Sequence, residues 1–91
     1  MLFRSGLQSA QVRELCDAIA SKSGGMVAVF SGTDEDGYSY CLMQRGGDLR
    51  GLNKAMTATL SGRGGGKPEY QQGSVKASQA NIEAFFQKEL L

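Results

Sequence analysis

The feature that most constrains the fold is an unbroken apolar run, Met26-Val27-Ala28-Val29-Phe30, which follows Gly24-Gly25 and precedes a polar turn. A strand with one face in water alternates apolar and polar residues, because successive side chains point to opposite faces. A short run that is apolar throughout therefore indicates a strand buried on both faces. We predict a central strand in a sheet that carries packed helices.

The residues before this run have the period of an amphipathic helix. Apolar side chains recur at i, i+3, i+4 and i+7, at Val12, Leu15, Cys16 and Ile19. This spacing predicts a helix over 10–21, which the glycine pair at 24–25 ends. After the apolar run, Asp36-Gly37 favours a hairpin turn, and residues 38–43 form the returning strand.

Two further helices each follow a residue that can cap them. The Asp48 carboxylate can accept hydrogen bonds from the first turn of a helix over 49–61, and Ser78 precedes a last helix. That last helix has an apolar stripe of Ile82, Phe85, Phe86 and Leu90. With short strands at 2–4 and 71–75, the predicted order is β-α-β-β-α-β-α. The predicted fold class is α/β (α+β), a single domain over 1–91 with an about four-stranded mixed sheet and three packed helices.

A glycine cluster, Gly62-Arg63-Gly64-Gly65-Gly66-Lys67-Pro68, separates the second helix from the strand at 71–75. Glycine exposes backbone N–H groups, and neighbouring cations suit an anion such as phosphate. We therefore interpret the cluster as an ordered phosphate-binding loop, and a flexible surface loop is the alternative. A nucleotide-hydrolysing P-loop does not fit, because proline follows the lysine where that motif requires serine or threonine opening a helix.

Positive charge is concentrated in the same part of the chain, although the formal net charge is only +1. Residues 44–76 contain six lysines and arginines against two acids. Arg50 and Lys54 stand four residues apart and share a helix face. If these cations meet Arg63 and Lys67, the chain presents one basic surface to a polyanion; otherwise they are scattered, solvated side chains.

Several classes of function are excluded or disfavoured. The chain has no histidine, so histidine bases, Ser-His-Asp triads and histidine-ligated zinc are excluded. Its two cysteines have no metal-ligand spacing, and Cys16 lies on the apolar helix face, which is typical of a buried thiol in a reducing cytoplasm. No apolar run approaches the roughly 20 residues that span a bilayer.

The glycine cluster and its continuation, Glu69-Tyr70-Gln71-Gln72-Gly73-Ser74, resemble the signature of the DHH-associated domain, in the form found at the C-terminus of alanyl-tRNA synthetases and AlaX-type editing proteins. The resemblance extends to 29–32, 36–40, 47–50, 52–55 and 73–86. It implies a tRNA-binding module, with zinc and the editing chemistry in a separate N-terminal domain. We therefore expect this chain to be a non-catalytic C-terminal domain of a longer cytoplasmic protein, with no cofactor of its own.

The expected partners are tRNA, most specifically alanine tRNA, and the N-terminal editing domain, with a homodimer as a further possibility and no membrane. Self-association is an alternative function. The substrate-binding domain of a DHH phosphoesterase is another, but there a histidine follows the glycines, and here Lys67-Pro68 stands instead. Tyr70 can stack on a base. The predicted nucleic-acid-binding residues are Arg50, Lys54, Arg63, Gly64, Gly65, Gly66, Lys67, Tyr70 and Gln72.

Overall fold

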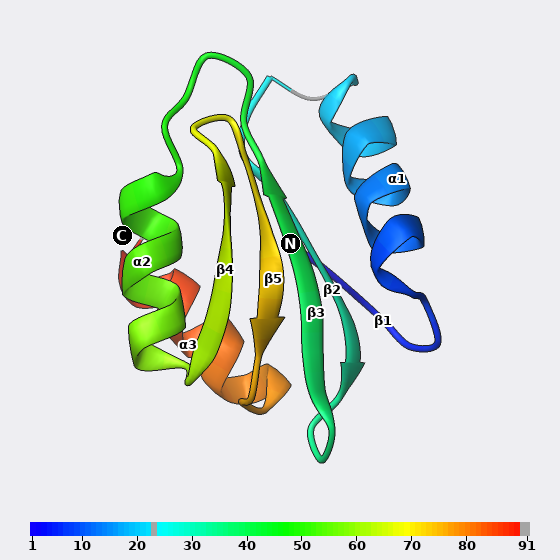
Figure 1. The fold of residues 1–91 in the computed structure, drawn as a ribbon, viewed down its shortest axis with the longest axis vertical. Helices are drawn as coiled ribbons and strands as arrows, with labels where there is room; N and C mark the ends of the chain where they lie inside the picture. The colour runs from blue at the N-terminus through cyan, green and yellow to red at the C-terminus, as the bar shows by residue number, and fades with distance from the viewer. Residues whose placement is uncertain (23, 90–91) are drawn as a thin grey trace.

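The computed structural model describes residues 1–22 and 24–89, which form one layered α+β domain (Figure 1). Leu90, which the sequence placed on the last apolar stripe, lies outside these residues. The elements are β1 (Leu2–Arg4), α1 (Ser9–Ala20), β2 (Val27–Thr33), β3 (Gly37–Met43), α2 (Arg50–Thr59), β4 (Gly62–Lys67), β5 (Tyr70–Val75) and α3 (Gln79–Glu89). Among the described residues, no helix is both long enough and apolar enough to span a membrane.

The sheet is mixed and has the strand order β1-β2-β3-β5-β4. β1 pairs with β2 in parallel, and the other neighbours are antiparallel. β1, α1 and β2 therefore form a parallel β-α-β unit. β5 lies between β3 and β4, so that β4 forms one edge of the sheet.

Helices cover both faces of the sheet, as Figure 1 shows, with α1 on one side and α2 and α3 on the other. The run from Val27 to Phe30 explains this arrangement. Ala28 and Phe30 belong to the core under α2 and α3, whereas Val27 and Val29 belong to the core under α1. All four side chains are buried, which confirms the predicted central strand.

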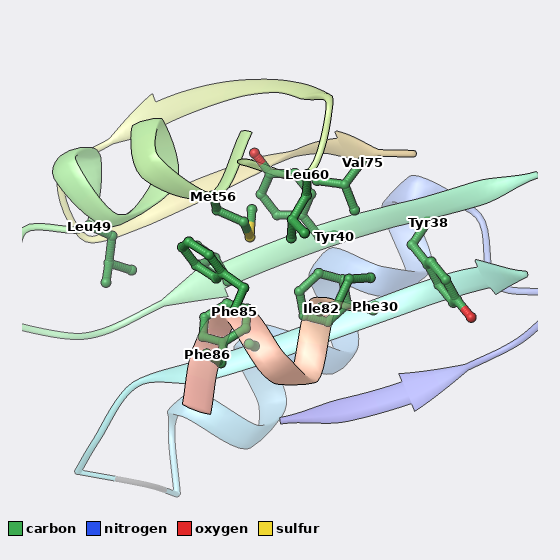
Figure 2. Close-up of a cluster of buried hydrophobic side chains, with 12 residues drawn as sticks. Phe30, Tyr38, Tyr40, Leu49, Met56, Leu60, Val75, Ile82, Phe85 and Phe86 are labelled. Carbon is green, nitrogen blue, oxygen red and sulfur yellow. The ribbon is translucent and has the colours of Figure 1, made fainter. Parts of the chain in front are cut away.

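The larger core lies between the sheet, α2 and α3 (Figure 2). The Phe30 ring packs edge-on against Phe86 at 5.9 Å between centroids, and Phe86 packs edge-on against Phe85 at 5.3 Å. Tyr38 and Tyr40, which share a strand face by their period of two, both belong to this core. Burying each large apolar side chain stabilises the fold by roughly 1.5–3 kcal/mol.

Asp48 and Ser78 both accept a hydrogen bond from the first turn of the helix that follows, although Asp48 is one residue before the N-cap position. The Arg50 amide donates to Asp48 Oδ1 at 3.1 Å, although Leu49 is the residue at the N-cap position of α2. The Asn81 amide donates to Ser78 Oγ at 3.2 Å at the start of α3. The carboxylate of Asp34, in the β2–β3 turn, also accepts from the Gln79 amide at 2.8 Å, which ties the hairpin to α3.

The sheet has five strands where the sequence predicted about four, because Gly62–Lys67 is a strand and not a loop. All six residues of β4 pair with β5, from Gly62 opposite Val75 to Lys67 opposite Tyr70. Pro68 and Glu69 form the turn between the two strands. Glycine is depleted in strands because it costs conformational entropy and packs no side chain, so local pattern alone disfavours this strand.

Candidate functional site

The candidate site is the face of β4 and β5 that α1 leaves uncovered, which we call the β4–β5 face. In an antiparallel pair, directly opposed residues point to the same side of the sheet. Tyr70 packs against the core under α1, so its partner Lys67 is on that side too. Alternation then assigns the following residues to the β4–β5 face: Arg63, Gly65 and Lys67 of β4, and Tyr70, Gln72 and Ser74 of β5.

This face is open because α1 packs on β2 and β3, at the other half of the sheet. All members of the β4–β5 face are exposed except Tyr70, which is half-buried. Two shallow hollows, of about 560 and 500 Å³, lie between α1 and these strands. Gln72 and Ser9 line both hollows, Arg13 lines the first and Arg63 the second. Arg63 therefore stands over a recess that a flexible ligand can enter.

Arg13 is a member of this site that sequence reasoning missed. Its guanidinium carbon lies 5.1 Å from the centre of the Tyr70 ring, within cation–π range. The Tyr70 hydroxyl in turn donates to the Gln72 side-chain oxygen. Burial raises the pKa of Tyr70, so the hydroxyl keeps its proton at neutral pH. The sequence carried no signal for this contact, because Arg13 and Tyr70 are distant in the chain and meet only through the fold.

The first turn of α1 also borders the site. Ser9 and Ala10 line the hollow beside Gln72, and the first turn contains no acidic residue. The amino end of a helix carries a partial positive charge that favours anions. Glu14 and Asp17 line the same hollow from α1, whereas both charged residues of β4 are cations. The surface therefore becomes more positive from α1 towards the β4 edge, where Arg63 and Lys67 lie.

The glycines of β4 have packing roles on the opposite face. A Cβ atom added to Gly64 would lie 1.9 Å from the Tyr40 hydroxyl, and one added to Gly62 would lie 2.6 Å from a Val75 methyl group. Gly66 has φ +150°, which disfavours other residues, and an added Cβ would lie 2.3 Å from the Tyr70 carbonyl oxygen. The run of glycines lets the buried Tyr40 hydroxyl lie directly on the β4 backbone.

Gly65 is the exception. A Cβ atom added there meets nothing within 4 Å, and its backbone is not in the left-handed region. It lies opposite Gln72 on the β4–β5 face. No contact within the chain therefore explains a glycine at this position, whereas a bare backbone between two cations does suit a ligand that approaches closely.

Arg50 and Lys54 do not join this face. They lie on α2, which packs on the opposite side of the sheet. Arg50 is also engaged, because its Nε and terminal nitrogen donate to Asp48 at 2.9 and 2.8 Å. These hydrogen bonds lower the pKa of Asp48 to about 2, so the pair stays charged over the whole physiological range. The predicted basic surface is therefore divided between two faces.

The structure thus brings together five of the nine residues predicted from the sequence, namely Arg63, Gly65, Lys67, Tyr70 and Gln72. Gly64 and Gly66 lie on the opposite face of the sheet, as described above. Ser39 and Ser74, which line the second hollow, were not predicted. Within residues 1–22 and 24–89, no cluster of three or more histidine, cysteine or acidic side chains could hold a metal ion.

Comparison with known proteins shows which protein family shares this sequence and architecture. The DHHA1 domain matches residues 1–89. An alanine–tRNA ligase of Acholeplasma laidlawii (strain PG-8A) is 28% identical over 76 residues, which are 84% of this chain and 9% of that protein. The crystal structure of the C-Ala domain from Aquifex aeolicus alanyl-tRNA synthetase has the same fold, with a TM-score of 0.77 over 96% of this chain and 87% of that chain, at 15% identity. The chain is therefore a member of the DHHA1 domain family.

Proposed function

We propose that this chain is a non-catalytic module that binds tRNA, with alanine tRNA as its first candidate ligand. The observation that carries the proposal is the β4–β5 face, where two cations flank an unobstructed glycine backbone beside a half-buried tyrosine. Family membership and the likeness to alanyl-tRNA synthetases support it. Since the chain spans 9% of the length of the Acholeplasma relative, the activities of a whole parent protein are part of the proposal.

The chemistry of the face suits a sugar–phosphate backbone. Arg63 and Lys67 can each meet a phosphate, Arg63 with its planar fork and Lys67 as a point charge. An edge strand leaves N–H groups unpaired along its outer side, and glycine leaves them accessible. Because the N–H groups of an antiparallel strand point alternately towards its partner and away from it, either Gly65 or the pair Gly64 and Gly66 remain candidate backbone donors, as members of a strand edge and not of a loop. Phosphate contacts of this kind position a nucleic acid without reading its sequence.

The parent protein, in this proposal, is an alanyl-tRNA editing hydrolase or a synthetase-related protein of the cytoplasm. By resemblance, a separate domain would carry the zinc and the hydrolysis, and this module would hold the tRNA. Arg50 and Lys54 would then lie at the margin of the contact, since α2 flanks the β4 edge from the other side.

Self-association is the second candidate, and β4 is the observation that favours it. A six-residue edge strand without proline can pair with the same strand of a second copy. Arg63 and Lys67 oppose this pairing, because two copies would bring like charges together. The phosphoesterase alternative has no support of this kind, since Lys67-Pro68 still replaces the histidine that it requires.

The test is a fluorescence-anisotropy titration of the chain with labelled alanine tRNA and a non-cognate tRNA across salt concentrations. If Arg13, Arg63 and Lys67 each meet a phosphate, affinity falls roughly 40-fold between about 50 and 200 mM salt. Arg63→Ala and Lys67→Ala each lower the salt slope by about one. Lys88→Ala, on the opposite side of the sheet, is the matched control.

The outcomes separate the candidates. Equal losses for Lys88→Ala and Lys67→Ala would mean diffuse charge attraction and would overturn the assignment of the face. Absence of binding, together with a concentration-dependent dimer in sedimentation, would favour self-association through β4.

A further inference from the structure

A second surface lies on the other side of the sheet, between the end of α2 and the length of α3. We call it the α2–α3 groove, and it encloses about 440 Å³. Its α3 wall is a stripe at helical spacing, made of Asn81, Ala84, Phe85 and Lys88. Ala84 lines the hollow with a small, exposed side chain, so a larger side chain at this position would project into it.

The floor of the groove is apolar and firmly held. Leu60 and Phe85 contribute to it, and each is only about one-twentieth exposed because it also packs in the main core (Figure 2). The Phe85 ring is held edge-on by Phe86. At the rim, the Lys76 amide donates to the Ser61 carbonyl at 3.3 Å, which joins the end of β5 to the end of α2. A rigid apolar floor costs little entropy to present to a partner.

Among the side chains that the structure describes, the charged residues that line the groove are both lysines. Lys76 precedes α3 and Lys88 lies in its last turn, so the two stand at opposite ends of the helix. With about 1.5 Å rise per residue, Gln79 and Lys88 are about 13 Å apart along the axis. No acidic residue lines the groove, and neither lysine has an ion-pair partner among the described residues. The complementary ligand therefore carries negative charge at both ends and an apolar group between them.

We propose that the α2–α3 groove docks an acidic segment of a partner polypeptide, with one apolar anchor residue between two carboxylates. An extended chain rises about 3.3 Å per residue, so carboxylates four residues apart are about 13 Å apart, which matches the axial length of α3 from Gln79 to Lys88. A nucleic acid is the less suitable occupant, because phosphates gain nothing from the Leu60 and Phe85 floor. The groove is distinct from the β4–β5 face and would leave that face free for tRNA.

The test uses a synthetic pentapeptide, Glu-Ala-Phe-Ala-Glu, blocked at both ends, titrated into the 91-residue chain and followed by ¹H–¹⁵N NMR. Amide shifts should concentrate at Ser61, Lys76, Asn81 and Ala84. Replacing both peptide glutamates by glutamine should weaken binding roughly fivefold, since each exposed ion pair contributes about 0.2–1 kcal/mol. Replacing the phenylalanine by serine should abolish the shifts.

Protein variants complete the test. Lys76→Glu and Lys88→Glu should each weaken binding and together abolish it, whereas Lys22→Glu, on the far side of the sheet, is the charge-matched control for each single reversal. Ala84→Phe should fill the groove and block the peptide without reversing charge. Shifts that map elsewhere, or that survive the double lysine reversal, would overturn the proposal, as would the absence of any shift at millimolar peptide. Shifts in the groove with alanine tRNA in place of peptide would also overturn it and assign the groove to nucleic acid.

Discussion

Gly64→Ala should be strongly destabilising, because Gly64 lies against the only buried tyrosine–asparagine hydrogen bond among the described side chains. The added Cβ would lie 1.9 Å from the Tyr40 hydroxyl and 2.6 Å from the Gln72 carbonyl oxygen. Ordinary contact begins near 3.4 Å, so the hydroxyl must retreat by about 1.5 Å. Tyr40 is 2% exposed and Asn53 is 5% exposed, so the Tyr40 hydroxyl has no free space to move into.

The magnitude follows from two costs and one gain. Overpacking a filled site costs about 1–3 kcal/mol, and leaving the buried Asn53 oxygen unpaired costs about 1–3 kcal/mol. Alanine in a strand recovers about 0.5–1 kcal/mol relative to glycine. The net loss is about 1–5.5 kcal/mol, with a central value of about 3 kcal/mol, and this central value corresponds to a fall in Tm of roughly 12–24 °C for a domain of this size.

The neighbouring residue supplies the matched control. Gly65→Ala adds the same methyl group to the same strand, but its Cβ meets nothing within 4 Å. It should therefore be neutral or stabilising by up to about 1 kcal/mol. Urea unfolding followed by circular dichroism measures the stability of both variants. The unfolding midpoints of Gly64→Ala and Gly65→Ala should differ by roughly 1–3 M urea.

A double-mutant cycle identifies the cause. Tyr40→Phe removes the hydroxyl that meets the new Cβ, although the contact with the Gln72 carbonyl remains. In that background, Gly64→Ala should cost at least about 1 kcal/mol less than in the parent chain. Equal midpoints for Gly64→Ala and Gly65→Ala, or strictly additive effects with Tyr40→Phe, would refute the packing explanation of the glycine run.

Three further predictions concern pH, charge and chemistry. The pKa of Asp34 is lowered, first by the Gln79 amide and then by the Tyr38 hydroxyl at 2.7 Å. The contribution of the Asp34 carboxylate to stability is therefore complete above its unfolded pKa of about 3.9, and it is lost as the pH falls through the lower pKa of the folded state. The difference in urea midpoint between the parent chain and Asp34→Asn should therefore shrink between pH 5 and pH 2. Arg50→Ala should change tRNA affinity less than twofold, because the Arg50 guanidinium is held by the Asp48 carboxylate. Arg63→Ala should weaken tRNA affinity up to about fivefold. A larger loss for Arg50→Ala than for Arg63→Ala in the anisotropy assay would place the interface on α2. The 91-residue chain, which has no histidine, should release no amino acid from mischarged alanine tRNA and no nucleotide from short oligonucleotides, and turnover that survives rigorous purification would contradict its assignment as a binding module.

Local patterns in the sequence determined most of the elements. The apolar stripe of α1, the continuous apolar run of β2 and the caps of α2 and α3 each involve residues close together in the chain. Their periods of 3.6 and 2 therefore predict helix and strand without knowledge of the partner. The same period of two places Tyr38 and Tyr40 on one strand face, and the structure shows that this face belongs to the core.

Only the tertiary structure decided that the glycine cluster is a strand and which residues share the face of the candidate site. Gly62–Lys67 has no strand pattern of its own, and it becomes a strand because β5 pairs with it while the Tyr40 hydroxyl lies over Gly64. The same pairing separates Arg63 and Lys67 from Arg50 and Lys54, although all four lie within 50–67 of the sequence. Arg13, which is distant in sequence, instead reaches the Tyr70 ring. Periodicity predicts which side chains lie on the same face of one helix or strand. Which helices and strands contribute to a common face depends on pairing between residues that are distant in the sequence.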